Sequence, residues 1–216
     1  MININEYLVS KTKEAGFGIK ATNENIKDLV NESIKNYGTG VDLNFIDTSK
    51  VTNMNSLFDQ TDFEGDISYW NVSNVTNMNY MFYQCENFNC NLSNWEPKNL
   101  ERAEGMFEGC INFIGTGLDN WELPKLKYAN FMFANCENFN QDLSKWDPIK
   151  LKNALKMFYN CEKLKGTGLE HWTTSSLEDM GSMFDGCLSL YVDLSNWDVT
   201  NVKYYDDYFL DACISK

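Results

Sequence analysis

The chain has 216 residues, of which 43% are hydrophobic and 14% aromatic, and it carries 31 acidic against 18 basic side chains, a net charge of -13. The apolar content excludes a disordered chain, because it suffices to bury a continuous core. The negative charge argues against nucleic-acid binding through the phosphate backbone, which needs basic side chains. No apolar run reaches the length of about 18 that a membrane-spanning helix requires, so no membrane partner is expected.

Residues 1–41 are predicted to form a helical segment that caps the N-terminal end of the core. An amphipathic helix is expected from Asn23 to Tyr37, with Thr22 or Asn23 as its cap and Gly38 at its end. Its apolar side consists of Ile26, Leu29, Val30 and Ile34. A second short helix is expected around Ile4 to Thr12.

The first residues contain no basic segment followed by an apolar run, so no signal peptide is recognised. The protein is therefore expected in the cytoplasm, or in the host cytoplasm if a phage encodes it. A cell-surface or secreted protein whose export signal has been removed is the alternative.

From residue 42 to 216 the chain contains about seven repeats of one unit of about 25 residues. All six tryptophans fall in one series at intervals of 25 or 26 residues, and Ile46 takes the same place in the first unit: Trp70, Trp95, Trp121, Trp146, Trp172 and Trp197. A unit this short cannot bury its apolar side alone, so the units are expected to stack into a solenoid. The last unit is predicted to be a degenerate C-terminal cap, in which Tyr208 to Ala212 replaces the usual motif.

Other positions keep register with the tryptophans, and each is expected to form a ladder along the core. Met-Phe stands eleven and twelve residues after each Trp, and Cys fifteen after. Five of the seven cysteines occupy this position: Cys85, Cys110, Cys136, Cys161 and Cys187. Equivalent residues of stacked coils point in parallel, so we expect buried free thiols rather than disulfides. No C-x-x-C pair suggests zinc, and free thiols favour a reducing compartment.

Within each unit, Leu-x-x-Trp is the best strand candidate, because it is short and flanked by turn-forming residues. The stretch that ends in Met-Phe-x-x-Cys has apolar residues three and four apart, which predicts a short helical segment on the opposite wall. The expected fold is an α/β solenoid, a leucine-rich-repeat-like right-handed coil with one short strand and one short helical segment per repeat. Gly-Thr-Gly-Leu recurs 51 residues apart, at Gly115 and Gly166, where positive φ angles and an extra residue in the turn are expected.

Two stretches, Asn71 to Cys85 (NVSNVTNMNYMFYQC) and Phe139 to Asp147 (FNQDLSKWD), closely resemble the BspA-like leucine-rich-repeat family. Its units read W-D-V-S-N-V-T-N-M-x-x-M-F-x-x-C-x-x-F-N-x-D-L-S, and the resemblance spans residues 42 to 213. The resemblance implies adhesion or protein binding without enzymatic activity, in bacterial, mycoplasmal, protist or phage-encoded proteins. Surface members carry an export signal and an anchor that are not found in this chain, so an intracellular or phage-encoded binder is also expected.

The search for catalytic chemistry yields no convergent set of residues. His171 is the only histidine and no phosphate-binding motif occurs, so we expect no enzyme, no cofactor and no metal. Acidic residues recur near each Trp and are expected to form turns, with a calcium ladder as the alternative: Asp66, Asp119, Asp142, Glu170 and Asp193.

The predicted function is a protein–protein interaction module, because non-repeating residues on a repeated scaffold provide a recognition surface. The candidate partner-binding residues precede each Trp: Tyr69, Asn94, Asn120, Lys145, His171 and Asn196. The alternatives are a phage- or mobile-element-encoded acidic inhibitor that blocks a basic, nucleic-acid-binding groove of a host protein, and a bacterial surface adhesin. The expected partner is a protein and not nucleic acid, and the expected state is a monomer, or a dimer through a solenoid face or end.

Overall fold

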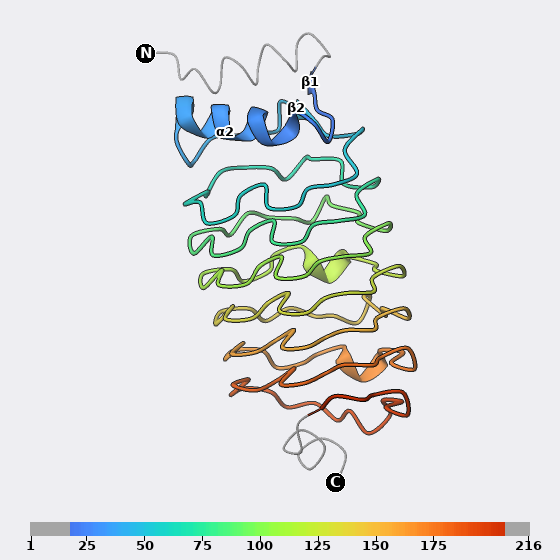
Figure 1. Ribbon diagram of the computed structural model, residues 1–216. Coiled ribbons are helices and arrows are strands. Elements are labelled where there is room, and N and C mark those ends of the chain that lie inside the picture. The colour runs from blue at the N-terminus through green and yellow to red at the C-terminus, as the bar shows by residue number, and fades with distance from the viewer. Residues whose placement is uncertain (1–17, 206–216) are drawn as a thin grey trace.

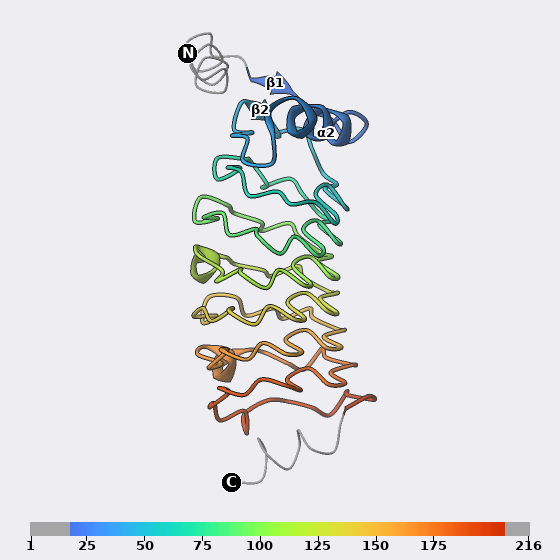
Figure 2. The same cartoon turned by 90° about the vertical axis from the view of Figure 1, so that its left-hand side faces the viewer.

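The computed structural model describes residues 18–205 as successive turns of chain stacked along one axis, with a helix at one end (Figures 1 and 2). We name each turn, or coil, by one residue that it contains, Ile46 in the first coil and a tryptophan in each later coil, and a coil begins three residues before that residue. The helix expected around Ile4 to Thr12, the altered motif of the last unit and Cys213 lie outside the described residues.

The helix α2 (Ile26–Tyr37) confirms the amphipathic helix expected in this region. It starts at Ile26 rather than Asn23, with Asn25 as the residue before its first turn, so the expected cap at Thr22 or Asn23 is wrong. It ends at Gly38, where φ is 88° and the N–H donates to the Ile34 carbonyl at 2.8 Å. Ile26 and Val30 are buried, so α2 covers the first coils with its apolar side.

The segment before α2 adds one further backbone layer to the stack. Strand β1 (Ile19–Lys20) pairs in parallel with β2 (Ile46–Asp47), and Ile19 lies opposite Ile46. No other strand forms within residues 18–205, but isolated parallel bridges continue from coil to coil seven residues after each Trp. They join Asn53, Asn77, Arg102, Tyr128, Asn153, Asp179 and Tyr204.

The strand expected at Leu-x-x-Trp is wrong for the described residues. In each such segment the Trp N–H donates to the carbonyl of the Leu three residues earlier, for example from Trp95 to Leu92 at 3.0 Å, which closes a turn. The two Gly-Thr-Gly units tighten this turn into 3-10 helices, η1 (Leu118–Asn120) and η2 (Leu169–His171). Positive φ at the glycines is confirmed, with 93° at both Gly117 and Gly168.

The helical segment expected before Cys is also wrong. Backbone N–H groups here donate alternately to the next coil and within their own: Tyr80 to the Glu104 carbonyl at 2.8 Å, but Met81 to Met78 at 3.2 Å. Residues ten and fourteen after each Trp adopt left-handed φ angles, such as 55° at both Tyr80 and Gln84. These positive angles interrupt any α-helix, because an α-helix needs consecutive right-handed residues.

The core consists of side-chain ladders along the stack. The phenylalanines of the Met-Phe position stack with ring centroids 5.3–5.6 Å apart from Phe58 to Phe184. The indoles from Trp95 to Trp197 stack at 6.0–6.3 Å. Of the described helices, none is long and apolar enough to cross a membrane.

Candidate functional site

The tryptophans tie neighbouring coils together by hydrogen bonds as well as by stacking. Each indole Nε1–H donates to a backbone carbonyl of the preceding coil. The accepting residue lies three residues before the Trp of that preceding coil; for Trp70 it lies three residues before Ile46. Trp146, for example, donates to Leu118 at 2.7 Å. The same carbonyl accepts the backbone N–H of Trp121, so both of its lone pairs are used. These residues are committed to the scaffold.

The cysteine ladder is a second set of side-chain donors. Each thiol donates to the carbonyl of the Phe in the preceding coil, as Cys136 does to Phe107 at 2.9 Å. Burial raises the pKa of the Cys85 thiol to about 11, and it raises the pKa of Cys136 well above its usual range. The thiols therefore stay protonated and can donate. The predicted free, buried thiols are confirmed for Cys85, Cys110, Cys136 and Cys161, whereas Cys187 is partly exposed.

Three of the five recurring acidic residues near each Trp form turns through their side chains. Asp66, Asp142 and Asp193 each accept the backbone N–H of the Ser two residues later, at 2.8–2.9 Å. Glu170 instead accepts the Gly168 N–H at 2.9 Å. Within residues 18–205 no group of three or more His, Cys, Asp or Glu side chains is placed to hold a metal ion.

The six predicted partner-binding residues lie in one exposed row along the stack, which we call the tryptophan edge: Tyr69, Asn94, Asn120, Lys145, His171 and Asn196. Several of them bind neighbouring coils. Asn94 donates to the Ser68 carbonyl at 3.3 Å, and the Lys145 ammonium contacts the Asn120 side chain at 2.9 Å. His171 lies 3.6 Å from Glu170 and is 67% exposed in its side chain. Part of this edge therefore serves coil-to-coil cohesion.

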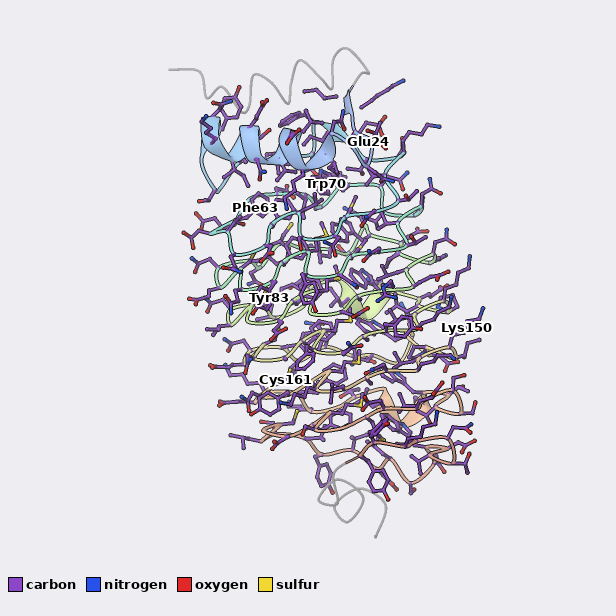
Figure 3. All side chains as sticks on the ribbon, viewed as in Figure 1. Glu24, Phe63, Trp70, Tyr83, Lys150 and Cys161 are labelled. Atoms are coloured by element: carbon purple, nitrogen blue, oxygen red, sulfur yellow. The ribbon has the colours of Figure 1, made fainter. Side chains whose placement is uncertain are left out.

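A second surface, which we call the pocket face, consists of the residues ten and thirteen after each Trp or after Ile46. Tyr83 belongs to it and lies in the left half of the stack in Figure 3, away from Lys150 at the right edge. Trp70, Phe63 and Cys161, also labelled there, are buried. These residues change type from coil to coil: Ser56, Tyr80, Gly105, Phe131, Lys156 and Ser182 at ten, and Asp59, Tyr83, Glu108, Ala134, Tyr159 and Asp185 at thirteen.

The pocket face contains an open pocket of about 360 Å³ that spans four successive coils. It is lined by Ser56, Asp59, Tyr80, Tyr83, Glu108 and Phe131. Between two of these coils, Gly105 stands where Tyr80 and Phe131 stand in the adjacent coils. A Cβ at Gly105 would lie 2.6 Å from the Tyr80 ring, so the glycine lets that ring lie across it.

Both aromatic rings and acidic groups line the pocket. The rings of Tyr80 and Tyr83 meet edge to face, with centroids 5.8 Å apart. Burial raises the pKa of the Glu108 carboxyl, although Lys156 opposes this shift. Burial, and then the charges of Glu104 and Glu108, raise the pKa of the Tyr80 hydroxyl. The local potential is therefore negative.

Sequence reasoning missed the pocket face because its residues fall in the segment expected to be helical. The available signal was variation inside the Met-x-x-Met-Phe-x-x-Cys motif, where aromatic, charged and small residues alternate between repeated core positions. Which of these variable positions lie next to one another depends on the stacking of coils.

The stacked coils define a repeat protein whose repeated residues build the scaffold. The family model described as "Mycoplasma protein of unknown function, DUF285" matches residues 24–146, 104–168 and 129–214, three overlapping segments of the same repeat. The chain therefore belongs to this family. No curated protein and no solved structure matches the chain.

Proposed function

We propose that this chain is a non-catalytic protein-binding module and that the pocket face carries recognition. One observation carries the proposal: the repeated residues are buried or hydrogen-bonded between coils, whereas the pocket face varies and is rich in tyrosine. Tyr, Trp and Arg dominate the energetics of protein interfaces, because rigid aromatic side chains bury much area at little entropic cost. The aromatic members of the pocket face are Tyr80, Tyr83, Phe131 and Tyr159.

We further propose that the stack is a solenoid of the BspA-like leucine-rich-repeat type. The Trp, Met-Phe and Cys positions that carry the resemblance are the ones that form the buried ladders. The leucine-rich-repeat relationship and the right-handed sense of the coil remain predictions.

Crosslinking capture from a host lysate tests the function and distinguishes the two surfaces. The full chain should capture a protein that a charge-matched acidic control protein does not. Capture should be lost for the double variant Tyr83→Ala, Tyr159→Ala and retained for Tyr69→Ala, His171→Ala on the tryptophan edge. The reverse pattern would place recognition on the tryptophan edge, and no capture above the control would refute the binding function.

A second candidate is the acidic inhibitor of a basic, nucleic-acid-binding groove. It is favoured by the charge distribution, because residues 18–110 contain 14 acidic and 6 basic side chains. Residues 111–170 contain 7 acidic and 8 basic side chains, and residues 171–205 contain 5 acidic and 1 basic, so the acidic surface would be limited to the two ends of the described stack. Such an inhibitor should displace DNA from its target, and its affinity should fall steeply with added salt.

A further inference from the structure

We propose that the pocket binds the guanidinium group of an arginine side chain presented by a partner protein. This inference rests on the proposed function and specifies the chemistry of the partner. The pocket combines aromatic walls, carboxylates that pair with no cation among the described residues, and a negative surrounding charge. Each of these features favours a planar cation.

The aromatic walls provide the first contact. The rings of Tyr80, Tyr83 and Phe131 line the pocket, and Gly105 lets the Tyr80 ring lie across it. Rings of this face already hold a cation: the Lys156 ammonium lies 4.8 Å from the Tyr159 centroid and 5.9 Å from that of Phe131. An arginine side chain can use such rings more fully, because its flat guanidinium stacks on aromatic faces.

The carboxylates provide the second contact. Asp59 lines the pocket, and its Oδ1 is buried without a hydrogen-bond partner. Within residues 18–205 Glu108 forms no ion pair, because the nearby Lys156 ammonium lies over aromatic rings. A buried acceptor such as Asp59 Oδ1 is unfavourable without a donor, and the partly exposed Glu108 carboxylate is open to one, so an incoming group that carries several N–H donors would be stabilised.

The size and surroundings of the pocket agree with a side chain from a protein. A volume of about 360 Å³ is near the lower end of ligand pockets, at about 300–1,000 Å³. The pocket is open, and five of its six lining residues belong to residues 18–110, where 14 acidic side chains outnumber 6 basic ones. Such a field attracts a basic partner over a distance.

Peptide titration of the full ¹⁵N-labelled chain, followed by NMR, tests the proposal. The probes are the capped pentapeptide Gly-Ser-Arg-Ser-Gly and its counterparts with citrulline or lysine in the centre. The arginine peptide should shift the amide signals of Tyr80, Gly105 and Phe131. Citrulline has the same shape without the charge, so its peptide should bind at least tenfold more weakly. Equal binding of both peptides, or shifts confined to other coils, would overturn the proposal.

Variants locate the binding groups. Asp59→Asn and Glu108→Gln keep side-chain shape and should each weaken the arginine peptide at least tenfold. Glu96→Gln removes the same charge from the coil that holds Glu108, but the Glu96 carboxylate lies outside the pocket and pairs with Lys98 at 3.7 Å, so affinity should be unchanged. Equal losses of affinity in all three variants would show that the peptide responds only to the net negative charge of the chain, and would refute the site. If Glu108→Gln does not fold, the comparison of Asp59→Asn with Glu96→Gln tests the site.

The two proposals can fail separately. A partner captured equally by the wild-type chain and by Asp59→Asn, Glu108→Gln would refute the arginine pocket and leave the binding module standing. Loss of capture in Tyr83→Ala, Tyr159→Ala together with no response to the arginine peptide would also refute the arginine pocket alone.

Discussion

At the scale of the residue, the repeated Trp and Cys positions are explained by hydrogen bonding as much as by hydrophobicity. The Trp indole N–H and the Cys thiol each donate to a carbonyl of the preceding coil that already accepts a backbone N–H. Phenylalanine or alanine would fill similar space without this second bond. The structure therefore accounts for the choice of side chains that can donate in a buried ladder.

The role of the thiol can be measured at Cys136, which is fully buried. Serine and alanine have nearly equal volumes, but only serine retains a donor for the Phe107 carbonyl. We expect Cys136→Ser to be more stable than Cys136→Ala by about 0.5–1.5 kcal/mol. Urea unfolding of both variants measures the difference. Greater stability of the alanine variant would show that the position needs only apolar filling.

At the scale of the element, turns rather than helices and strands shape each coil. Asx turns at residues such as Asp66 and Asp142, glycines with positive φ and left-handed residues such as Tyr80 redirect the chain at short intervals. The η1 turn shows how tightly coils approach. A Cβ at Gly117 would lie 2.2 Å from the Ser93 nitrogen, so only glycine fits there.

Two glycines with positive φ test different costs. At Gly38, with φ 88° and ψ 172°, an added Cβ would meet nothing within 4 Å, whereas at Gly117, with φ 93° and ψ -7°, it would meet backbone. Gly38→Ala should cost about 1–3 kcal/mol, because its backbone lies in a region that essentially only glycine populates. Gly117→Ala should cost about 1–2 kcal/mol for the left-handed conformation and about 1–3 kcal/mol more because the Ser93 backbone must move. A total cost below about 2 kcal/mol for Gly117→Ala in chemical unfolding would contradict the close approach.

At the scale of the whole molecule, each coil is held in place by contacts with its immediate neighbours. The side-chain bonds between coils join residues 23–30 apart in sequence, such as Thr48 with Asn71 and Asn23 with Asn53. Repeat proteins of this kind are stabilised by nearest-neighbour interfaces, so local damage should stay local. The α2 helix closes one end of this stack through Ile26 and Val30.

The end helix offers a test of this locality. Val30→Asn places an unpaired amide in a fully buried position and should destabilise the N-terminal end by about 2 kcal/mol or more. The six indole N–H groups report on six successive coils, so their hydrogen exchange can be followed by NMR. Exchange at Trp70 should accelerate while exchange at Trp172 stays unchanged. Lys27→Asn, on the exposed side of α2, is the control, and uniform acceleration would indicate a single cooperative unit.

Residue type and spacing were enough to predict the repeat, its register and the side chains of the core. The Trp, Phe and Cys columns, the apolar side of α2 and its end at Gly38 could all be read from spacing, because burial and capping depend on residue type and period. The turn-forming role of Asp66, Asp142 and Asp193 could be read in the same way.

The local backbone and the pocket depend on how the coils stack on one another. Donors in Met-x-x-Met-Phe-x-x-Cys pair partly with the next coil, so the preferences of a single unit could not reveal that turns replace the expected helix. The pocket needs Asp59, Tyr80, Glu108 and Phe131 from four coils, with Gly105 beneath the Tyr80 ring. These residues are far apart in sequence, and stacking at the observed register alone brings them together.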